Sequence, residues 1–371
     1  MTFSSDVLKQ DERAIFGLRS LYRSFGYTQF KMSKFEEYDL YVRNKSFLVS
    51  DHIITFTDTN GKLMALKPDV TLSIVKNSKD TPDSVQKVFY DENVYRVSGG
   101  HSSYREIMQA GLECIGCVDD YCIAEVLTLA VESLSHISPD FVLDISHLGI
   151  LSAVLDAIPV SDSARANMLH CVGEKNLHGI DEICKSEGID PSLADTLKSL
   201  VCGYGSVNSV IEKLSVSLTD EACRAMLKDL KTILSAVPCN KIRIDFSVVN
   251  DLGYYNGIVF KGFVNGIPQS ILSGGQYDNL MKKMGRRSGA IGFALYLDLL
   301  EELAATPREY DVDVVLLYDE TISAKIVLDT VKSITDSGKT VSAQRTNSEK
   351  IRCKELLRLS EKGVERLENH A

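Results

Sequence analysis

The sequence predicts an α+β fold in which helices flank an antiparallel sheet, and three patterns indicate it. Asn-Gly lies between apolar runs twice, at Asn60-Gly61 and Asn265-Gly266, which is a strong hairpin signal. Residues 241–248 alternate strictly between apolar and polar side chains, as a half-buried strand does. Helical periodicity fills much of the sequence between the strand-like runs. Consecutive strands joined by hairpins favour an antiparallel sheet with helices packed on it.

The N-terminal half supplies the first helices and strands of this fold. Residues 6–25 carry apolar side chains at three- and four-residue steps, which indicates a helix that begins at Asp6 and ends at Gly26. The first hairpin joins residues 53–58 to residues 63–66, and Pro68 opens a short helix. Beyond it we expect strands at 87–97 and 105–118, a helix at 124–135 and a strand at 141–145.

The remaining sequence divides into three parts. Residues 161–236 show helical spacing without strand runs, broken in two at Gly203-Tyr-Gly-Ser206. Strands then return at 241–248, 258–264 and 267–272, followed by a buried helix at 290–304. The tail predicts strands at 312–317 and 340–344 and helices at 323–337 and 349–368. We therefore expect a discontinuous core (1–160 and 237–305), a helical insertion (161–236) and a short C-terminal α/β unit (311–371).

Composition limits the class of protein. The 371 residues include 9 scattered cysteines, which suits a reducing compartment, and we expect a cytoplasmic protein without a signal peptide or membrane span. The net charge of −10 disfavours a large nucleic-acid surface. Cys114-Ile-Gly-Cys117 has the spacing of a metal pair but lies in an apolar run, so packing thiols are expected. No metal or cofactor is expected.

One strand carries the clearest candidate for a binding site. Along residues 105–113, Gln109 and Glu113 point to one face on either side of Gly111, while Ala110 and Leu112 point to the other. A glycine between two polar groups leaves space above the sheet. The polar face therefore indicates either the floor of a small-molecule pocket or an ordinary solvated face.

Other candidate residues have equally simple structural explanations. Tyr254 and Tyr255 stand between glycines where two strands meet, and could wall a pocket or anchor a turn. Asp69 could bind a ligand or cap the helix that follows, and Thr71 could be a surface hydroxyl. Arg96, at a strand end, could bind a carboxylate or face solvent.

Taken together, these segments resemble the histidyl-tRNA synthetase family of class II synthetases. The similar segments are Leu66-Lys-Pro-Asp-Val-Thr71, Val94-Tyr-Arg96, Tyr104-Arg-Glu-Ile-Met-Gln-Ala-Gly-Leu-Glu113, Gly253-Tyr-Tyr-Asn-Gly-Ile-Val-Phe260, Gly274-Gly-Gln-Tyr-Asp278 and Gly289-Ala-Ile-Gly-Phe-Ala294. The resemblance implies a class II synthetase-like core over about residues 6–305. It also implies a histidine pocket in which the amino group meets Asp69, Thr71 and Gln109, the carboxylate meets Arg96, and the imidazole meets Glu113, Tyr254 and Tyr255.

The departures from this family concern ATP. Its catalytic arginine is Asn250 here, its loop arginine falls at Ser103, and the arginine of its terminal helix is Leu299. Ser98 replaces the glutamate of the adenylate site, and Ser33 replaces a proline in the dimer-forming segment. Polyphosphate binding needs fixed cations or metal, so adenylation is not expected. The tail is about half the length of the family's anticodon-binding domain, so no tRNA is expected either.

A synthetase-like core with these losses resembles the regulatory subunits of ATP phosphoribosyltransferase. That resemblance implies a non-catalytic protein that pairs with a short catalytic subunit, in the first step of histidine biosynthesis, and takes part in inhibition by histidine. It also implies a homodimer of the core. Two alternatives stay open from the sequence: an active histidine–tRNA ligase with a shortened tail, and a stand-alone histidine sensor or tRNA-binding adaptor.

Overall fold

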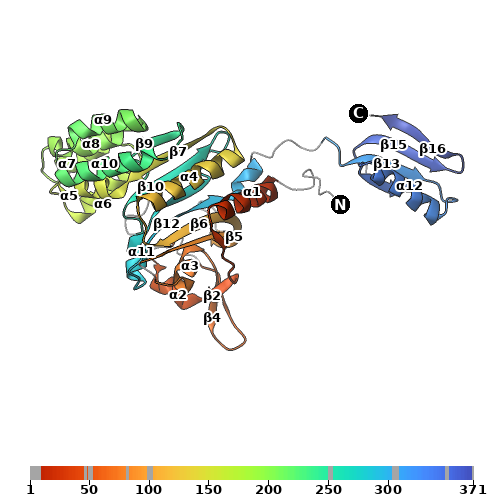
Figure 1. The fold of residues 1–371 in the computed structure, drawn as a ribbon, viewed down its shortest axis with the longest axis horizontal. Helices are drawn as coiled ribbons and strands as arrows, with labels where there is room; N and C mark the ends of the chain where they lie inside the picture. Colours follow the sequence, from red (N-terminus) through yellow and green to blue (C-terminus); the bar gives the residue numbers. More distant parts are fainter. Residues whose placement is uncertain are drawn as a thin grey trace. The chain divides into compact units, whose positions relative to one another are not determined.

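The chain divides into two compact units, residues 1–304 and residues 305–371 (Figure 1). A computed structural model describes residues 10–45, 48, 53–80, 83–97, 103–249, 254–302, 309–346 and 351–369. The predicted start of the first helix at Asp6 lies outside these residues. Within them, no helix combines the length and the apolar character needed to span a bilayer.

A large mixed sheet organises the first unit. Within the described residues its strands run in the order β1-β5-β6-β12-β11-β10-β7-β9-β8. The pairing is antiparallel from β5 to β7, whereas β1 with β5 and β7 with β9 are parallel. The bounds are β1 Thr28–Gln29, β5 Val85–Val97, β6 Tyr104–Gly116, β7 Phe141–His147, β8 Tyr204–Ser206, β9 Ile242–Asp245, β10 Ile258–Val264, β11 Leu272–Gln276 and β12 Gly289–Tyr296. The α+β class is confirmed, with parallel pairs added toward the edges.

Helices cover one face of this sheet and extend beyond one end of it. The covering helices are α1 Gln10–Ser24 and α4 Asp120–Ile137. A second group, green in Figure 1, gathers beside β7 and β9. It comprises α5 Leu148–Asp156, α6 Asp162–Gly173, α7 Leu177–Ser186, the 3₁₀ turn η3 Pro191–Ala194, α8 Asp195–Cys202, α9 Val207–Ser217 and α10 Glu221–Ser235. The predicted break inside this group is the short strand β8, which pairs with β9.

Smaller elements stand near the other end of the sheet. The first hairpin forms as predicted: β3 Thr55–Thr57 pairs with β4 Leu63–Leu66, and Gly61 turns with φ +83°. β2 Phe35–Glu37 pairs with the other edge of β4. The short helices here are α2 Tyr38–Arg43, α3 Thr71–Asn77 and α11 Asp278–Lys283.

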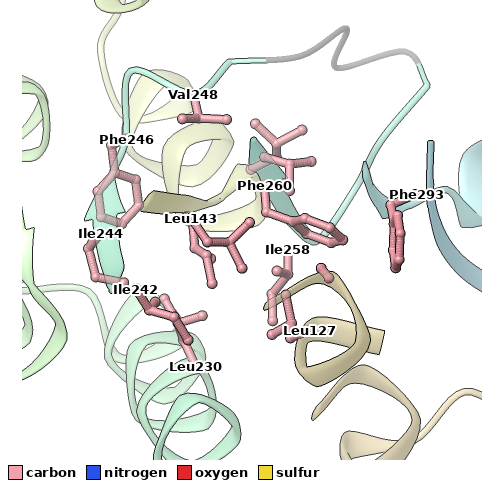
Figure 2. Close-up of a cluster of buried hydrophobic side chains, with 14 of the residues drawn as sticks. Leu127, Leu143, Leu230, Ile242, Ile244, Phe246, Val248, Ile258, Phe260 and Phe293 are labelled. Atoms are coloured by element: carbon pink, nitrogen blue, oxygen red, sulfur yellow. The ribbon is translucent and has the colours of Figure 1, made fainter. Parts of the chain in front are cut away.

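The core lies between the large sheet and its helices (Figure 2). The apolar side of the alternating segment is buried as predicted: Ile242, Ile244 and Phe246 pack near Leu143 of β7 and Leu230 of α10. Strand β6 shows both of its predicted faces, because Ala110, Leu112 and Cys114 join this core while Gln109 and Glu113 lie on the opposite face. Cys114 is therefore a packing thiol, but Cys117 is exposed, so that prediction is wrong for the second cysteine.

The predicted helix at 290–304 is wrong. Residues 289–296 form the central strand β12, and only Leu297–Glu302 coil, as the 3₁₀ helix η4. A strand covered on both faces is apolar throughout and loses the alternation that would mark it. The strand expected at 267–272 begins only at Leu272. Pro268, which lacks a backbone N–H, lies inside the expected range.

The second unit is a small sheet backed by one described helix. Its order is β14-β13-β15-β16, with β13 Val312–Tyr318, α12 Ala324–Asp336, β14 Val341–Gln344, β15 Cys353–Ser360 and β16 Gly363–Asn369. The predicted helix at 349–368 is wrong, because β15 and β16 form a hairpin there. Leu357 and Leu359 both pack toward α12, at strand spacing, and Gly363 has φ +108°, which no helix contains.

Candidate functional site

The predicted site residues surround one pocket of about 510 Å³ on the face of the large sheet opposite α1 and α4. Strands β5, β6, β10, β11 and β12 form its floor, and the start of α3 and the segment before β10 form its walls. All seven residues line it: Asp69, Thr71, Arg96, Gln109, Glu113, Tyr254 and Tyr255. Of the two interpretations that the strand pattern left open, the structure has the pocket, while its ligand stays a prediction.

Glu113 lines this pocket and is only 2% exposed. Thr71 Oγ1 donates to its Oε1 at 2.8 Å, and Tyr277 OH donates to its Oε2 at 2.7 Å. Burial raises the pKa of Glu113 from 4.5 to about 8, although both hydrogen bonds oppose the rise. At neutral pH the empty pocket therefore holds a mostly protonated carboxyl that can give its proton to a basic ligand.

Two glycines make room for groups at this end of the pocket. A Cβ at Gly292 on β12 would overlap the Glu113 carboxylate, and a Cβ at Gly111 would overlap the Tyr90 hydroxyl and the Phe293 carbonyl. Gly292 and Glu113 are cross-strand partners. The glycines are therefore needed for space rather than for an unusual backbone angle.

Asp69 and Arg96 form a charged pair at the pocket wall. Asp69 Oδ1 accepts from the backbone N–H of Leu72 at 2.8 Å, so its predicted capping role is confirmed. Its Oδ2 lies 3.7 Å from Arg96 Nη2, and Arg96 Nε donates to the Pro68 carbonyl at 2.6 Å. Burial raises the pKa of Asp69, and the Arg96 charge partly offsets that rise. Capping and pocket lining are compatible, because the carboxylate has two oxygens.

Gln109 contributes a polar group without a protein partner. Its side chain is 2% exposed, and its Nε2 has no hydrogen-bond acceptor within the described structure. A buried amide N–H without an acceptor costs about 1–3 kcal/mol. An acceptor on a ligand, such as a carboxylate oxygen, would remove that cost.

Three tyrosines enclose the site, and two polar residues position them. The ring centroids of Tyr254 and Tyr255 are 4.4 Å apart, and Tyr277 lies 5.9 Å from Tyr254. Asn256 Nδ2 donates to Asp278 Oδ2 at 3.0 Å, and Asn256 Oδ1 accepts from the Asp278 backbone N–H at 2.8 Å. This reciprocal pair ties the Tyr-Tyr segment to the start of α11. It therefore joins two of the segments that resemble the synthetase family.

The family follows from comparison with known proteins. The family model for histidyl-tRNA synthetase matches residues 5–300. The chain belongs to the histidyl-tRNA synthetase family. It is 30% identical over 291 residues to a histidine–tRNA ligase of Methanococcus vannielii, covering 76% of this chain and 69% of that one. It is also 27% identical over 306 residues to an ATP phosphoribosyltransferase regulatory subunit of Oceanobacillus iheyensis, covering 81% and 75%. The predicted resemblance to both groups is thus confirmed.

Solved structures give the same fold. An ATP phosphoribosyltransferase regulatory subunit/histidyl-tRNA synthetase of Bacillus halodurans superposes with a TM-score of 0.72 at 23% identity, covering 93% of each chain. An ATP phosphoribosyl transferase complex of Thermotoga maritima gives 0.61 at 21% identity, covering 80% of this chain and 98% of that one. The class II synthetase-like architecture is therefore shown.

The departures from the family's ATP residues fall on different parts of the structure. Leu299, in η4, is partly buried and packs against the core, so it presents an aliphatic group where a cation is expected. Ser103 is exposed just before β6. Asn250 and Ser98 lie outside the described residues. Ser33 Oγ accepts from the Phe35 backbone N–H at 3.3 Å beside β2.

The sequence analysis missed four residues that shape the pocket of this protein. Tyr277 and Tyr90 line it, Gly292 makes room for Glu113, and Lys261 adds a cation on β10. Tyr277 lies within a motif shared with the family, but that motif alone gave it no role. Gly292 was hidden by the helix predicted at 290–304. Lys261 had a usable signal, because it interrupts the apolar strand between Phe260 and Phe263.

Proposed function

We propose that this chain is a cytoplasmic, non-catalytic regulatory subunit of ATP phosphoribosyltransferase. It would act with a short catalytic subunit that makes phosphoribosyl-ATP from ATP and phosphoribosyl pyrophosphate, the first step of histidine biosynthesis. Histidine would inhibit the complex by binding this chain. The observation that carries the proposal is that all seven predicted histidine-binding residues line one pocket, in a chain that has no cation at positions 103, 250 and 299.

The pocket chemistry suits histidine. Glu113 offers a buried carboxyl to an imidazole and can transfer its proton to the ring. Asp69 and Thr71 offer oxygen acceptors to an ammonium group. Arg96 offers donors to a carboxylate. The resemblance places Gln109 beside the amino group, but its unpaired Nε2 is a donor and suits the carboxylate instead. Each charge of the ligand therefore has a complementary group within one pocket.

The same pocket is poorly suited to adenylation. Positions 103, 250 and 299 hold serine, asparagine and leucine, and none of these can carry a positive charge. Losing one charged contact in a water-excluded site costs about 2.7–4 kcal/mol of transition-state stabilisation. Several such losses would leave no useful activation of histidine by ATP.

Regulation by this chain would be a linkage effect. The Thermotoga maritima structure with the same fold is an ATP phosphoribosyl transferase complex, which supports a hetero-oligomer for this chain. Histidine inhibits if it binds one state of the complex better than the other, with a typical coupling of about 1–3 kcal/mol. No tRNA binding is part of the proposal.

Reconstitution tests this function directly. The chain is mixed with the short catalytic subunit of its own organism, and phosphoribosyl-ATP formation is followed with and without histidine. We expect activity to require this chain and to fall when histidine is added. Glu113→Gln should weaken inhibition and leave basal activity intact. Full activity of the catalytic subunit alone, or the same inhibition with and without this chain, would reject the proposal.

An active histidine–tRNA ligase is the second candidate, because the Methanococcus vannielii relative bears that name at 30% identity. ATP–pyrophosphate exchange dependent on histidine separates the two. The regulatory subunit should give no exchange above a reaction without protein. Robust exchange would establish the ligase instead.

A further inference from the structure

The pocket floor continues well beyond the predicted histidine residues. Across β6, β12, β11 and β10, the residues Gly111, Ala294, Ser273 and Lys261 are successive cross-strand partners. Neighbouring strands lie about 4.8 Å apart, so Lys261 is about 14 Å across the sheet from Gly111. Glu113 and Gln109 flank Gly111 on β6. The pocket therefore has a carboxyl at one end of its floor and an ammonium at the other.

One amino acid does not reach both ends. A fully extended residue advances a chain by at most about 3.6 Å, so a single amino acid with its side chain stretched the opposite way spans roughly half of those ~14 Å. The charges of a bound histidine are already matched near β6, by Asp69, Arg96 and Glu113. The end at Lys261 is left for another group.

Lys261 has the properties of an anion-binding side chain. It is half-buried and lines the pocket. Withdrawal from water lowers the pKa of its ammonium group. No residue in the described part of the chain gives its Nζ an ion pair or a hydrogen bond. A partly desolvated cation without a counter-charge gains free energy when an anion binds.

The surroundings of Lys261 supply further donors and space. Ser273, its cross-strand partner on β11, and Ser270, in the turn before β11, both line this end of the pocket. Hydroxyl groups donate well to oxyanions. Ala294, the next residue in the row, is small enough to leave the space open.

We propose that this end of the pocket is a subsite for a single phosphate group, either free phosphate or the phosphate of a small monoester. One lysine and two hydroxyls can donate hydrogen bonds to one such group and neutralise one of its charges, but they are too few for a triphosphate. The proposal deepens the proposed function, on which it rests for the neighbouring histidine subsite: the pocket would sense histidine together with a phosphate.

Asp144 provides the competing explanation. It is the cross-strand partner of Lys261 on β7, and its Oδ1 is buried without a partner in the described structure. Burial and the neighbouring Asp245 raise its pKa to about 6. If Lys261 turned toward Asp144 in solution, the pair would neutralise itself and no anion would bind. The test must therefore include both residues.

Titration calorimetry on the full chain tests the subsite with inorganic phosphate, and separately with glycerol phosphate against glycerol, at constant ionic strength. We expect the wild type to bind at least one of the two phosphate probes, Lys261→Met to bind it at least tenfold more weakly, and Lys261→Arg to retain it. Binding of glycerol phosphate alone assigns the subsite to a monoester, and binding of both assigns it to phosphate in general. Lys213→Met, at an exposed lysine of α9, controls for loss of one positive charge.

Three results overturn the inference. They are no binding of either probe by the wild type, equal binding by Lys261→Met, and binding that appears only in Asp144→Asn. Histidine binding is measured in the same proteins without phosphate and should change less than twofold in Lys261→Met. If the wild type binds phosphate but not histidine, the proposed function alone is rejected. If the wild type binds histidine but neither phosphate probe, only this subsite is rejected.

Discussion

Glu113 is held by its neighbours in a state that suits a ligand better than it suits the empty fold. Its pKa of about 8 means that the folded protein keeps a proton which the unfolded chain loses near pH 4.5. Thr71 and Tyr277 hold the carboxyl in place, and Gly292 leaves it space. Burial of this carboxyl therefore costs the empty protein free energy, and an ion pair with an imidazole would regain part of it.

Replacing Glu113 by glutamine should change how stability depends on pH. As pH rises from 4.5 to 8, the unfolded wild type releases a proton that the folded state retains, so the wild type loses stability relative to Glu113→Gln. The loss should total a few kcal/mol and be complete above about pH 8. Denaturant unfolding at pH 5 and pH 8.5 measures it. Glu132→Gln on the exposed side of α4 is the control and should show no such trend.

Histidine affinity should have a plateau between about pH 6.5 and pH 8. In that range the empty site carries a proton and free histidine carries a neutral ring, so formation of imidazolium and carboxylate needs no net proton. Below the plateau free histidine is already protonated, and above it the site has lost its proton, so binding weakens on both sides. Calorimetry across pH checks this. If the histidine affinity of Glu113→Gln falls above pH 8 as that of the wild type does, Glu113 is not the group responsible.

Tyr277→Phe should weaken both stability and histidine binding. It removes the 2.7 Å hydrogen bond to Glu113 and leaves a buried oxygen without its donor, which costs about 1–3 kcal/mol. Tyr22→Phe is the matched control, because Tyr22 OH lies 3.0 Å from Ser133 Oγ on the core side of the sheet. Both variants should lose stability, but only Tyr277→Phe should lose histidine-dependent stabilisation in thermal unfolding. Equal losses of histidine-dependent stabilisation in the two variants would show that Tyr277 has only a structural role.

At the scale of elements, strand β6, whose polar and apolar residues alternate, was predicted, and strand β12, which lacks that alternation, was missed. β6 shows its two faces in sequence, so the residue pattern alone was enough to place Gln109 and Glu113 on one face as a candidate pocket floor. The β12 sequence is apolar on both faces, so its residue pattern alone does not distinguish it from a buried helix. Sequence pattern therefore identified one strand of the floor, while the strand opposite it, with Gly292, required the sheet order.

The small sheet of β2, β4 and β3 is where a second copy of the core is expected to bind. Phe35 and Phe56 are 45% and 37% exposed, and their rings meet edge to face at 5.4 Å beside Ser33. Exposed aromatic pairs of this kind commonly mark protein contacts. This surface fits the homodimer that the resemblance implies, which stays a prediction.

Phe35→Ser with Phe56→Ser should shift the chain from dimer to monomer in sedimentation velocity. Burial of two aromatic side chains contributes several kcal/mol to an interface, so the change should exceed tenfold in the dissociation constant. Leu193→Ser, at an exposed apolar residue of η3, serves as the control and should leave the dimer intact. A wild type that sediments as a monomer, or a double variant that remains dimeric, would exclude this interface.

For the whole molecule, all described pocket residues belong to the first unit. Ending the chain at Ala304 should therefore preserve folding and histidine affinity within about twofold. Calorimetry and thermal unfolding of the shortened chain check this against the full chain. A fall of more than tenfold in affinity would show that residues 305–371 take part in the site.

The parallel pairing of β7 with β9 has a consequence for how this protein can change over evolution. The segment from α5 to α10 leaves the sheet after His147, adds β8 to its edge and returns at Ile242, on a strand that pairs directly with the one it left. Because the pairing is parallel, the exit at His147 and the return at Ile242, opposite Leu143, are separated by about 13 Å along the strand, a distance that the sheet fixes. Natural selection can thus lengthen or shorten the parts of this green lobe of Figure 1 that do not pack on the sheet, and with them any surface for new assemblies, while the binding cavity keeps its shape. Helix α10 has to stay, because its Leu230 packs near Leu143 in the core.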